Sequence, residues 1–168
     1  MSSVLQSTCP SAVMRWRKNA EHWSRQTKVP AALILAVIDQ ESDGNPTARR
    51  AEPTYHTTLI NRPKSAQRLR LMAASVGLNT KQLVTSYGLM QPLFTLAYGY
   101  GARSICDLED PDKNIRYCAA HLATLMAKHK GDIAKTAGAY NGAGSASKYA
   151  KDVVKLYNKY SAKLKKGA

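Results

Sequence analysis

Hydrophobic residues recur along much of the chain at spacings of three and four, which places them on one side of an α-helix. This spacing predicts helices from Ser11 to Lys28, from Pro30 to about Ser42, from Asp110 to Gly131 and from Asp132 to Asn141. No clear run alternates apolar and polar residues as a half-buried strand does, and no internal repeat is present. We therefore expect a mainly α fold with little or no sheet.

The middle of the chain has a weaker pattern. Residues 47–70 are polar and basic and contain two prolines, so they are expected to form a long loop or a short helical excursion. A turn of helix is predicted over residues 79–84, and a short helix from Phe94 to Tyr98. The stretch 47–84 is thus interpreted as an insertion between two ordered motifs.

The last predicted helix, over residues 150–166, has two different faces. One face is apolar and carries Val153, Leu156, Tyr157, Tyr160 and Leu164. The other carries a lysine at every fourth position, namely Lys151, Lys155, Lys159 and Lys163. Such a face is usually solvated on a docked helix, but it can also bind an anionic cell wall or membrane surface. Both interpretations stay open.

Length and charge narrow the function classes. The 168 residues are enough for a single domain, 1–168, with a core that needs no disulfide or metal. The net charge of +14 implies a polyanionic partner or environment, such as nucleic acid, an anionic membrane or the bacterial envelope. No apolar run approaches the roughly 20 residues that cross a bilayer. Residues 1–10 have neither a basic leader nor an apolar core, so we expect no signal peptide.

The cysteines do not suggest a structural framework. Cys9, Cys106 and Cys118 cannot all pair with one another, and they lack the short paired spacings of a zinc site. We expect buried or incidental thiols, no bound metal and no other cofactor.

Glu41 continues the apolar face of the second predicted helix. Steps of four place it on the side of Leu33 and Val37, beside Ile34 and Ile38. Burial and the negative end of the helix dipole would both raise its pKa. A carboxylic acid that stays protonated near neutral pH can protonate the leaving oxygen of a glycosidic bond. On position alone, however, a helix-end residue that faces solvent or pairs with an arginine is the better interpretation.

Three short motifs change this balance. Glu41-Ser42 is followed by Gly44-Asn45-Pro46, then by Gly88-Leu89-Met90-Gln91, and then by Ala139-Tyr140-Asn141. Together with residues 108–111 and 114–115, these strings resemble the motifs of the soluble lytic transglycosylase family over residues 29–149. Each string is weak by itself, but the three motifs and the segment 108–115 make four in chain order, with helix breaks at suitable places, and together they are a strong signal.

The resemblance implies a lysozyme-like helical domain with a cleft that binds peptidoglycan glycan strands. Glu41 would protonate the β-1,4 bond between N-acetylmuramic acid and N-acetylglucosamine. The same carboxylate would then take the proton of the sugar's 6-hydroxyl as that oxygen attacks the anomeric carbon. The product would be a 1,6-anhydro sugar, formed without water and without a second protein carboxylate.

Family position also implies a set of substrate-binding residues around Glu41. Ser42 would be a supporting hydroxyl, Met90 and Gln91 part of the cleft floor, and Tyr140 and Asn141 hydrogen-bonding groups near the acid. Gly88 would let the backbone approach the substrate closely. For Met90, an ordinary core position is an equally good interpretation.

A hydrolytic lysozyme (muramidase) acting on the same bond is the alternative, because ordinary glycosidases use two carboxylates. Between Glu41 and the second motif, only Asp43 and Glu52 are available. Residues 50–55 are similar to an Arg-x-Glu-Pro-x-x-Tyr pattern of some phage and goose-type-like relatives. This makes Glu52 and Tyr55 further substrate-binding candidates, although we expect Glu52 to be a structural residue paired with arginine.

Two proteins of another class would also be this basic: a nucleic-acid-binding protein and a non-catalytic wall-binding virion protein. No nucleic-acid motif accompanies the charge, and residues 142–145 lack the ending of a phosphate loop. We therefore expect no specific nucleic-acid partner. We also expect a monomer. High charge, small size and the missing leader suggest a phage endolysin, held in the host cytoplasm until a holin opens the way to the wall. A virion-borne enzyme would look the same.

Overall fold

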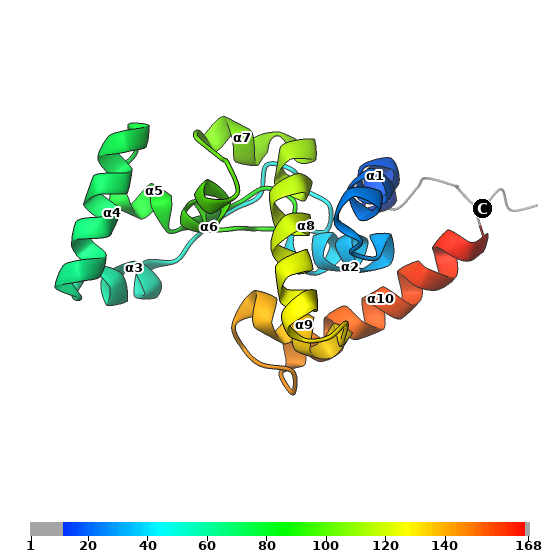
Figure 1. Ribbon diagram of the computed structural model, residues 1–168. Helices are drawn as coiled ribbons and strands as arrows, with labels where there is room; N and C mark the ends of the chain where they lie inside the picture. Colours follow the sequence, from blue (N-terminus) through cyan, green and yellow to red (C-terminus); the bar gives the residue numbers. More distant parts are fainter. Residues whose placement is uncertain (1–11, 167–168) are drawn as a thin grey trace, which may run out of the picture.

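The computed structural model describes residues 12–166 (Figure 1). Its first elements are η1 (Met14–Trp16), α1 (Arg17–Thr27), α2 (Ala31–Ser42), β1 (Arg49–Ala51), α3 (Pro53–Ile60), α4 (Pro63–Val76) and α5 (Thr80–Leu83). They are followed by β2 (Thr85–Tyr87), α6 (Phe94–Gly99), α7 (Ile105–Glu109), α8 (Pro111–Lys128), α9 (Ile133–Asn141) and α10 (Lys148–Lys166). The mainly α fold class is confirmed. The predictions for Cys9 and for a leader in residues 1–10 lie outside the described range.

One core is built around α2, which packs against α1 and α10. Every residue from Ala32 to Ile38 is buried, so this helix is apolar on all sides except near its ends. Residues of α8 and α10, including Ile115, Leu122, Val153 and Tyr160, complete the same cluster. Helix α2 ends at Ser42, as predicted, because Asp43 adopts a left-handed conformation with φ 50°.

A second core is formed by elements between α4 and α8. Its buried residues include Leu69, Leu83, Phe94, Leu108 and Tyr117. Helices α3, α4 and α5 lie at the end of the molecule opposite α1 and α10, with α8 between the two ends (Figure 1). The chain therefore has two packed regions.

Of the two expectations for residues 47–70, the structure favours the helical excursion over the long loop. This stretch forms β1, α3 and the first half of α4. Pro53 and Pro63 do not interrupt these helices; each lies in the first turn of one, where the missing N–H of proline costs nothing. Strand β1 pairs antiparallel with β2 in the order Arg49 to Tyr87, Arg50 to Ser86 and Ala51 to Thr85. The pairing brings residues 49–51 beside the Gly88 motif.

Helix α10 confirms the predicted C-terminal helix, beginning two residues earlier than expected. Val153 and Tyr160 are buried, and the four lysines of the stripe are exposed. Lys159 lies 3.1 Å from an oxygen of Asp39, so this member of the stripe also helps to attach α10 to α2. No helix in residues 12–166 is long and apolar enough to cross a membrane. Cys106 is an exposed free thiol and Cys118 a buried one.

Candidate active site

Glu41 lies in the last turn of α2, and its side chain is only 6% exposed. Its Oε1 accepts a hydrogen bond of 2.7 Å from the hydroxyl of Tyr149, at the start of α10. Its Oε2 lies 3.8 Å from a guanidinium nitrogen of Arg50, on β1. The predicted burial is therefore confirmed, while the pairing with an arginine is a long one.

Burial raises the pKa of Glu41 above its ordinary value, as the position on the apolar face predicted. The hydrogen bond from Tyr149 and the positive charge of Arg50 lower this pKa, and the negative charge of Glu52 raises it, but these effects are smaller than that of burial. The carboxyl group thus holds its proton to higher pH than an ordinary glutamate. This is the property that a general acid requires.

Glu41 opens onto a cleft of about 450 Å³. The cleft is lined by Glu41, Arg50, Glu52, Tyr55, Gln91, Leu93, Ala139, Tyr140, Asn141 and Gly142. These residues come from the end of α2, from β1 and α3, from the loop before α6 and from the end of α9. Six predicted site residues are thus brought together, whereas Ser42, Gly88 and Met90 do not line the cleft.

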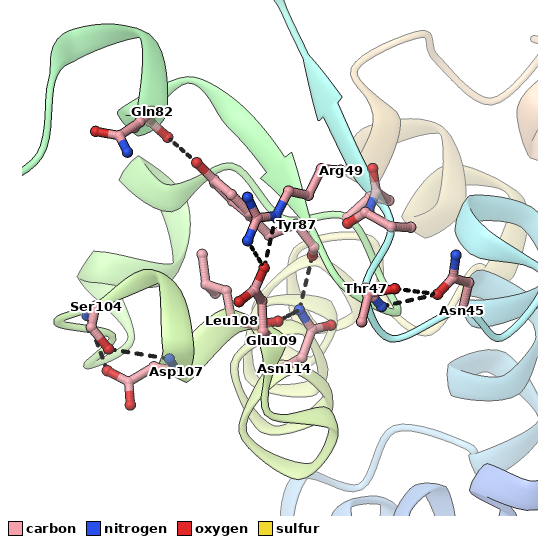
Figure 2. A network of polar contacts seen from close by, with 12 residues as sticks. Asn45, Thr47, Arg49, Gln82, Tyr87, Ser104, Asp107, Leu108, Glu109 and Asn114 are labelled. Atoms are coloured by element: carbon pink, nitrogen blue, oxygen red, sulfur yellow. Dashed lines mark hydrogen bonds and ion pairs between the residues drawn. The ribbon is translucent and has the colours of Figure 1, made fainter.

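The loop that carries Gly88 to Gln91 is held in place by a buried asparagine, Asn114 of α8. Figure 2 shows its amide donating to the carbonyls of Tyr87, at 2.9 Å, and Leu108, at 2.8 Å. Its side-chain oxygen accepts a hydrogen bond of 3.0 Å from the backbone N–H of Met90. Sequence reasoning used Asn114 only as part of the resemblance and missed this positioning role.

The structure corrects the expected role of Gly88. Its φ is +73°, and a Cβ atom would lie 2.4 Å from the carbonyl oxygen of Leu108 and 2.5 Å from the amide nitrogen of Asn114. Glycine is therefore required because the loop packs against α7 and α8. The close approach is to the protein itself and not to the cleft.

Met90 and Ser42 also act from behind the cleft wall. The Met90 side chain is fully buried, which favours the core interpretation over a place on the cleft floor. The Ser42 hydroxyl donates a 2.7 Å hydrogen bond to the carbonyl of Leu89, which ties the end of α2 to the same loop. The geometry suits a supporting hydroxyl, and that role stays a prediction.

The tyrosine that binds the acid is Tyr149 and not Tyr140, the one expected near it. Tyr140 lines the cleft, but its hydroxyl donates to the backbone carbonyl of Met90 at 2.7 Å. The hydroxyl that binds the acid belongs to Tyr149, which the motifs did not single out. Burial and the negative charge of Glu41 raise the pKa of Tyr149, so it remains a donor. The sequence signal for Tyr149 was its position shortly after the Gly142–Gly144 helix break, close to the third motif.

Three other cleft residues have distinct surroundings. Gln91 has φ +50° and donates from its side-chain amide to the carbonyls of Ala48, at 3.0 Å, and Gly88, at 2.8 Å. Its side-chain oxygen is left as the group it can offer a ligand. Glu52 forms a 2.7 Å ion pair with Arg50, the structural pairing expected for it, although it also faces the cleft. Asn141 is exposed at the end of α9.

Within residues 12–166, no group of three or more His, Cys, Asp or Glu side chains is placed to hold a metal ion. The groups that the cleft offers to a ligand are the carboxyl, hydroxyl, amide and guanidinium groups of its lining residues.

Comparisons with known proteins show a matching family and a similar fold. The family model described as Transglycosylase SLT domain matches residues 18–162. The solved structure "Crystal structure of Burkholderia AP3 phage endolysin" superposes with a TM-score of 0.53 and 16% sequence identity, covering 88% of this chain and 71% of that chain. No curated protein shows significant sequence similarity. The expected lysozyme-like fold is thereby confirmed.

Proposed function

We propose that this chain, which belongs to the transglycosylase SLT domain family, cleaves the β-1,4 bond between N-acetylmuramic acid and N-acetylglucosamine and leaves a 1,6-anhydro product. As a member of that family it is a peptidoglycan lytic transglycosylase; the bond and the product are the proposal. The observation that carries it is the nearly buried Glu41 carboxyl, with its raised pKa, at the wall of an open cleft.

In the first step, Glu41 gives its proton to the oxygen of the glycosidic bond. The bond from the anomeric carbon to that oxygen breaks, and its electron pair stays on the oxygen of the departing sugar. The neighbouring acetamido group of the substrate can share the positive charge left on the anomeric carbon. Because Glu41 Oε1 accepts the Tyr149 hydrogen bond, the transferred proton is carried by Oε2.

In the second step, the resulting carboxylate removes the proton of the 6-hydroxyl as its oxygen bonds to the anomeric carbon. The proton returns to Glu41, no water is consumed, and the enzyme is ready for another cycle. Tyr149 and Arg50 stabilise the carboxylate between the two steps, while burial favours its return to the acid form. A single carboxyl group can therefore act as acid and then as base.

The test is mass spectrometry of fragments released from purified peptidoglycan in water enriched in ¹⁸O. Anhydro-muramic ends without ¹⁸O are expected. Reducing muramic ends that carry ¹⁸O would instead establish hydrolysis and overturn the proposal.

Replacing Tyr149 with phenylalanine is expected to move the alkaline limb of the pH–activity profile to higher pH. The hydroxyl lowers the pKa of Glu41, so its loss raises that pKa further and keeps the acid protonated at higher pH. The profile of cleavage rate against pH measures this shift. Tyr160→Phe is the control, because Tyr160 lies on the same helix and donates at 2.7 Å to Asp39 of α2. An unchanged limb in Tyr149→Phe, or an equal shift in both variants, would contradict the role of Tyr149.

Hydrolysis is the second candidate, because Glu52 lines the same cleft as Glu41. If Glu41 acts alone, Glu52→Gln should keep a maximal rate within about tenfold of wild type, whereas loss of an essential acid or base group costs about 10²–10⁴-fold. The alkaline limb should move to lower pH, because the charge of Glu52 raises the pKa of Glu41. A loss of rate at every pH that matches the loss in a Glu41 variant would support two-carboxylate hydrolysis.

The fold match to a phage endolysin supports a biological setting for this activity. We place the protein as a monomer that lyses a bacterial host, reaching the wall from the cytoplasm through a holin-dependent opening. Expression inside bacteria with and without a holin tests this setting. Lysis that depends on the holin is expected, and lysis without it would exclude the proposed release.

A further inference from the structure

A smaller groove lies beside α4 and adjoins the catalytic cleft. Tyr55, on α3, is 46% exposed and lines both the cleft and the groove. The groove has a volume of about 210 Å³ and is lined by Tyr55, Leu59, Ser65, Arg68, Leu69, Met72 and Thr95. The cleft and the groove therefore adjoin at Tyr55, and a ligand that occupies the cleft beside this side chain lies next to the groove.

The groove combines a cation with apolar side chains. Ser65, Arg68, Leu69 and Met72 follow one another at the spacing of a single helix face. Arg68 is exposed, and its guanidinium group makes no hydrogen bond or ion pair with residues 12–166. Leu59 and Met72 supply apolar surface beside it. This surface suits a ligand that has both a carboxylate and small apolar groups. A neutral sugar does not have this combination.

The surrounding charge favours the same kind of ligand. No acidic residue occurs between Glu52 and Asp107, while that stretch includes Arg62, Lys64, Arg68, Arg70, Lys81 and Arg103. An anion that approaches α4 thus meets no acidic side chain from this part of the sequence. Charge complementarity therefore favours an anionic ligand in the groove. Because the groove adjoins the cleft, that ligand can be part of the molecule that the cleft binds.

We infer that this groove binds the peptide stem of peptidoglycan, with a stem carboxylate on Arg68 and the adjoining alkyl groups against Leu59 and Met72. The inference rests on the proposed function, because a glycan in the cleft brings its attached peptide to the groove. It assigns the α3–α4 segment to recognition of the stem, and makes Arg68 a specificity-determining residue for peptide-bearing glycan.

The experiment compares two soluble substrates with glycan strands of equal length, one with peptide stems and one from which an amidase has removed them. Arg68→Gln should raise KM about fivefold on the peptide-bearing strands, the effect of losing an interaction of about 1 kcal/mol. Neither kcat on those strands nor KM on the peptide-free strands should change. Arg70→Gln is the matched control, because residues two apart on a helix point to different sides. It should behave as wild type.

Each other outcome is decisive. Equal KM for wild type and Arg68→Gln on the peptide-bearing strands would overturn the inference, and so would the same rise in KM on both substrates. An equal effect in Arg70→Gln would show general attraction by positive charge and would also overturn it. Thermal unfolding confirms that each variant is folded, and Arg68→Glu should give a larger rise in KM than Arg68→Gln. A wild-type protein inactive on both substrates would instead contradict the proposed function.

Discussion

Peptidoglycan cleavage is expected to fall by about 10³-fold or more when Glu41 is replaced by glutamine. The amide can neither protonate the glycosidic oxygen nor accept the proton of the 6-hydroxyl, so both steps lose the group that moves the proton. Clearing of purified cell walls, followed as loss of turbidity, measures the effect. Glu21→Gln, on α1 and paired with Arg17, is the control and should keep wild-type activity.

The same variant should not lose stability, which separates lost chemistry from lost folding. The folded state raises the pKa of Glu41 above its unfolded value, so ionisation of this carboxyl costs stability as the pH rises through the folded pKa. Glutamine avoids that cost. Thermal unfolding at low and high pH should show that the stability of Glu41→Gln increases relative to that of wild type as the pH rises. Clearing within tenfold of wild type would remove Glu41 from its assigned role.

Gly88→Ala should lower the free energy of unfolding by about 3 kcal/mol or more, combining a left-handed conformation with overpacking. A Cβ atom at this position would overlap the backbone carbonyl of Leu108 and the amide of Asn114, neither of which is the free end of a flexible side chain. The loop would have to shift, including Met90, whose backbone carbonyl accepts a hydrogen bond from the hydroxyl of Tyr140. Urea denaturation measures the loss, and cleavage should fall as well.

Gly77→Ala provides the comparison for Gly88→Ala. Gly77 has φ +68°, close to that of Gly88, but no atom lies within 4 Å of the position a Cβ would take. It should lose only about 1 kcal/mol, the cost of the left-handed conformation alone. Equal losses in the two variants would mean that the close packing at Gly88 contributes nothing.

The acid could be predicted from sequence because its environment is largely local. Helix α2 is apolar and buried from Ala32 to Ile38, and Glu41 lies one turn beyond these residues, so much of its burial follows from its own helix. Tyr149 could not be predicted in this way, since it lies 108 positions away in sequence and meets Glu41 only when α10 packs on α2. The motif strings identified residue types, but not which of two tyrosines in this region of the chain reaches the acid.

Two further features could not be settled from sequence, because they also depend on tertiary packing. In residues 47–70, polarity and two prolines left a loop and a short helical excursion equally open, because a proline in the first turn of a helix is compatible with that helix. In the Gly88 motif, the glycine was expected to let the backbone approach the substrate, and Met90 was left open between the cleft floor and the core. Their structural roles involve the backbone: the space beside Gly88, and the N–H and carbonyl of Met90.

The contact between Tyr149 and Glu41 also sets an order of events during synthesis. The acid emerges from the ribosome early, while α10, which supplies its hydroxyl partner and covers α2, is made more than a hundred residues later. A nascent chain that ends before Lys148 has Glu41 without this partner and leaves part of α2 uncovered. The carboxyl group therefore acquires its hydrogen-bond partner and its full burial only after α10 has been made and has packed on α2.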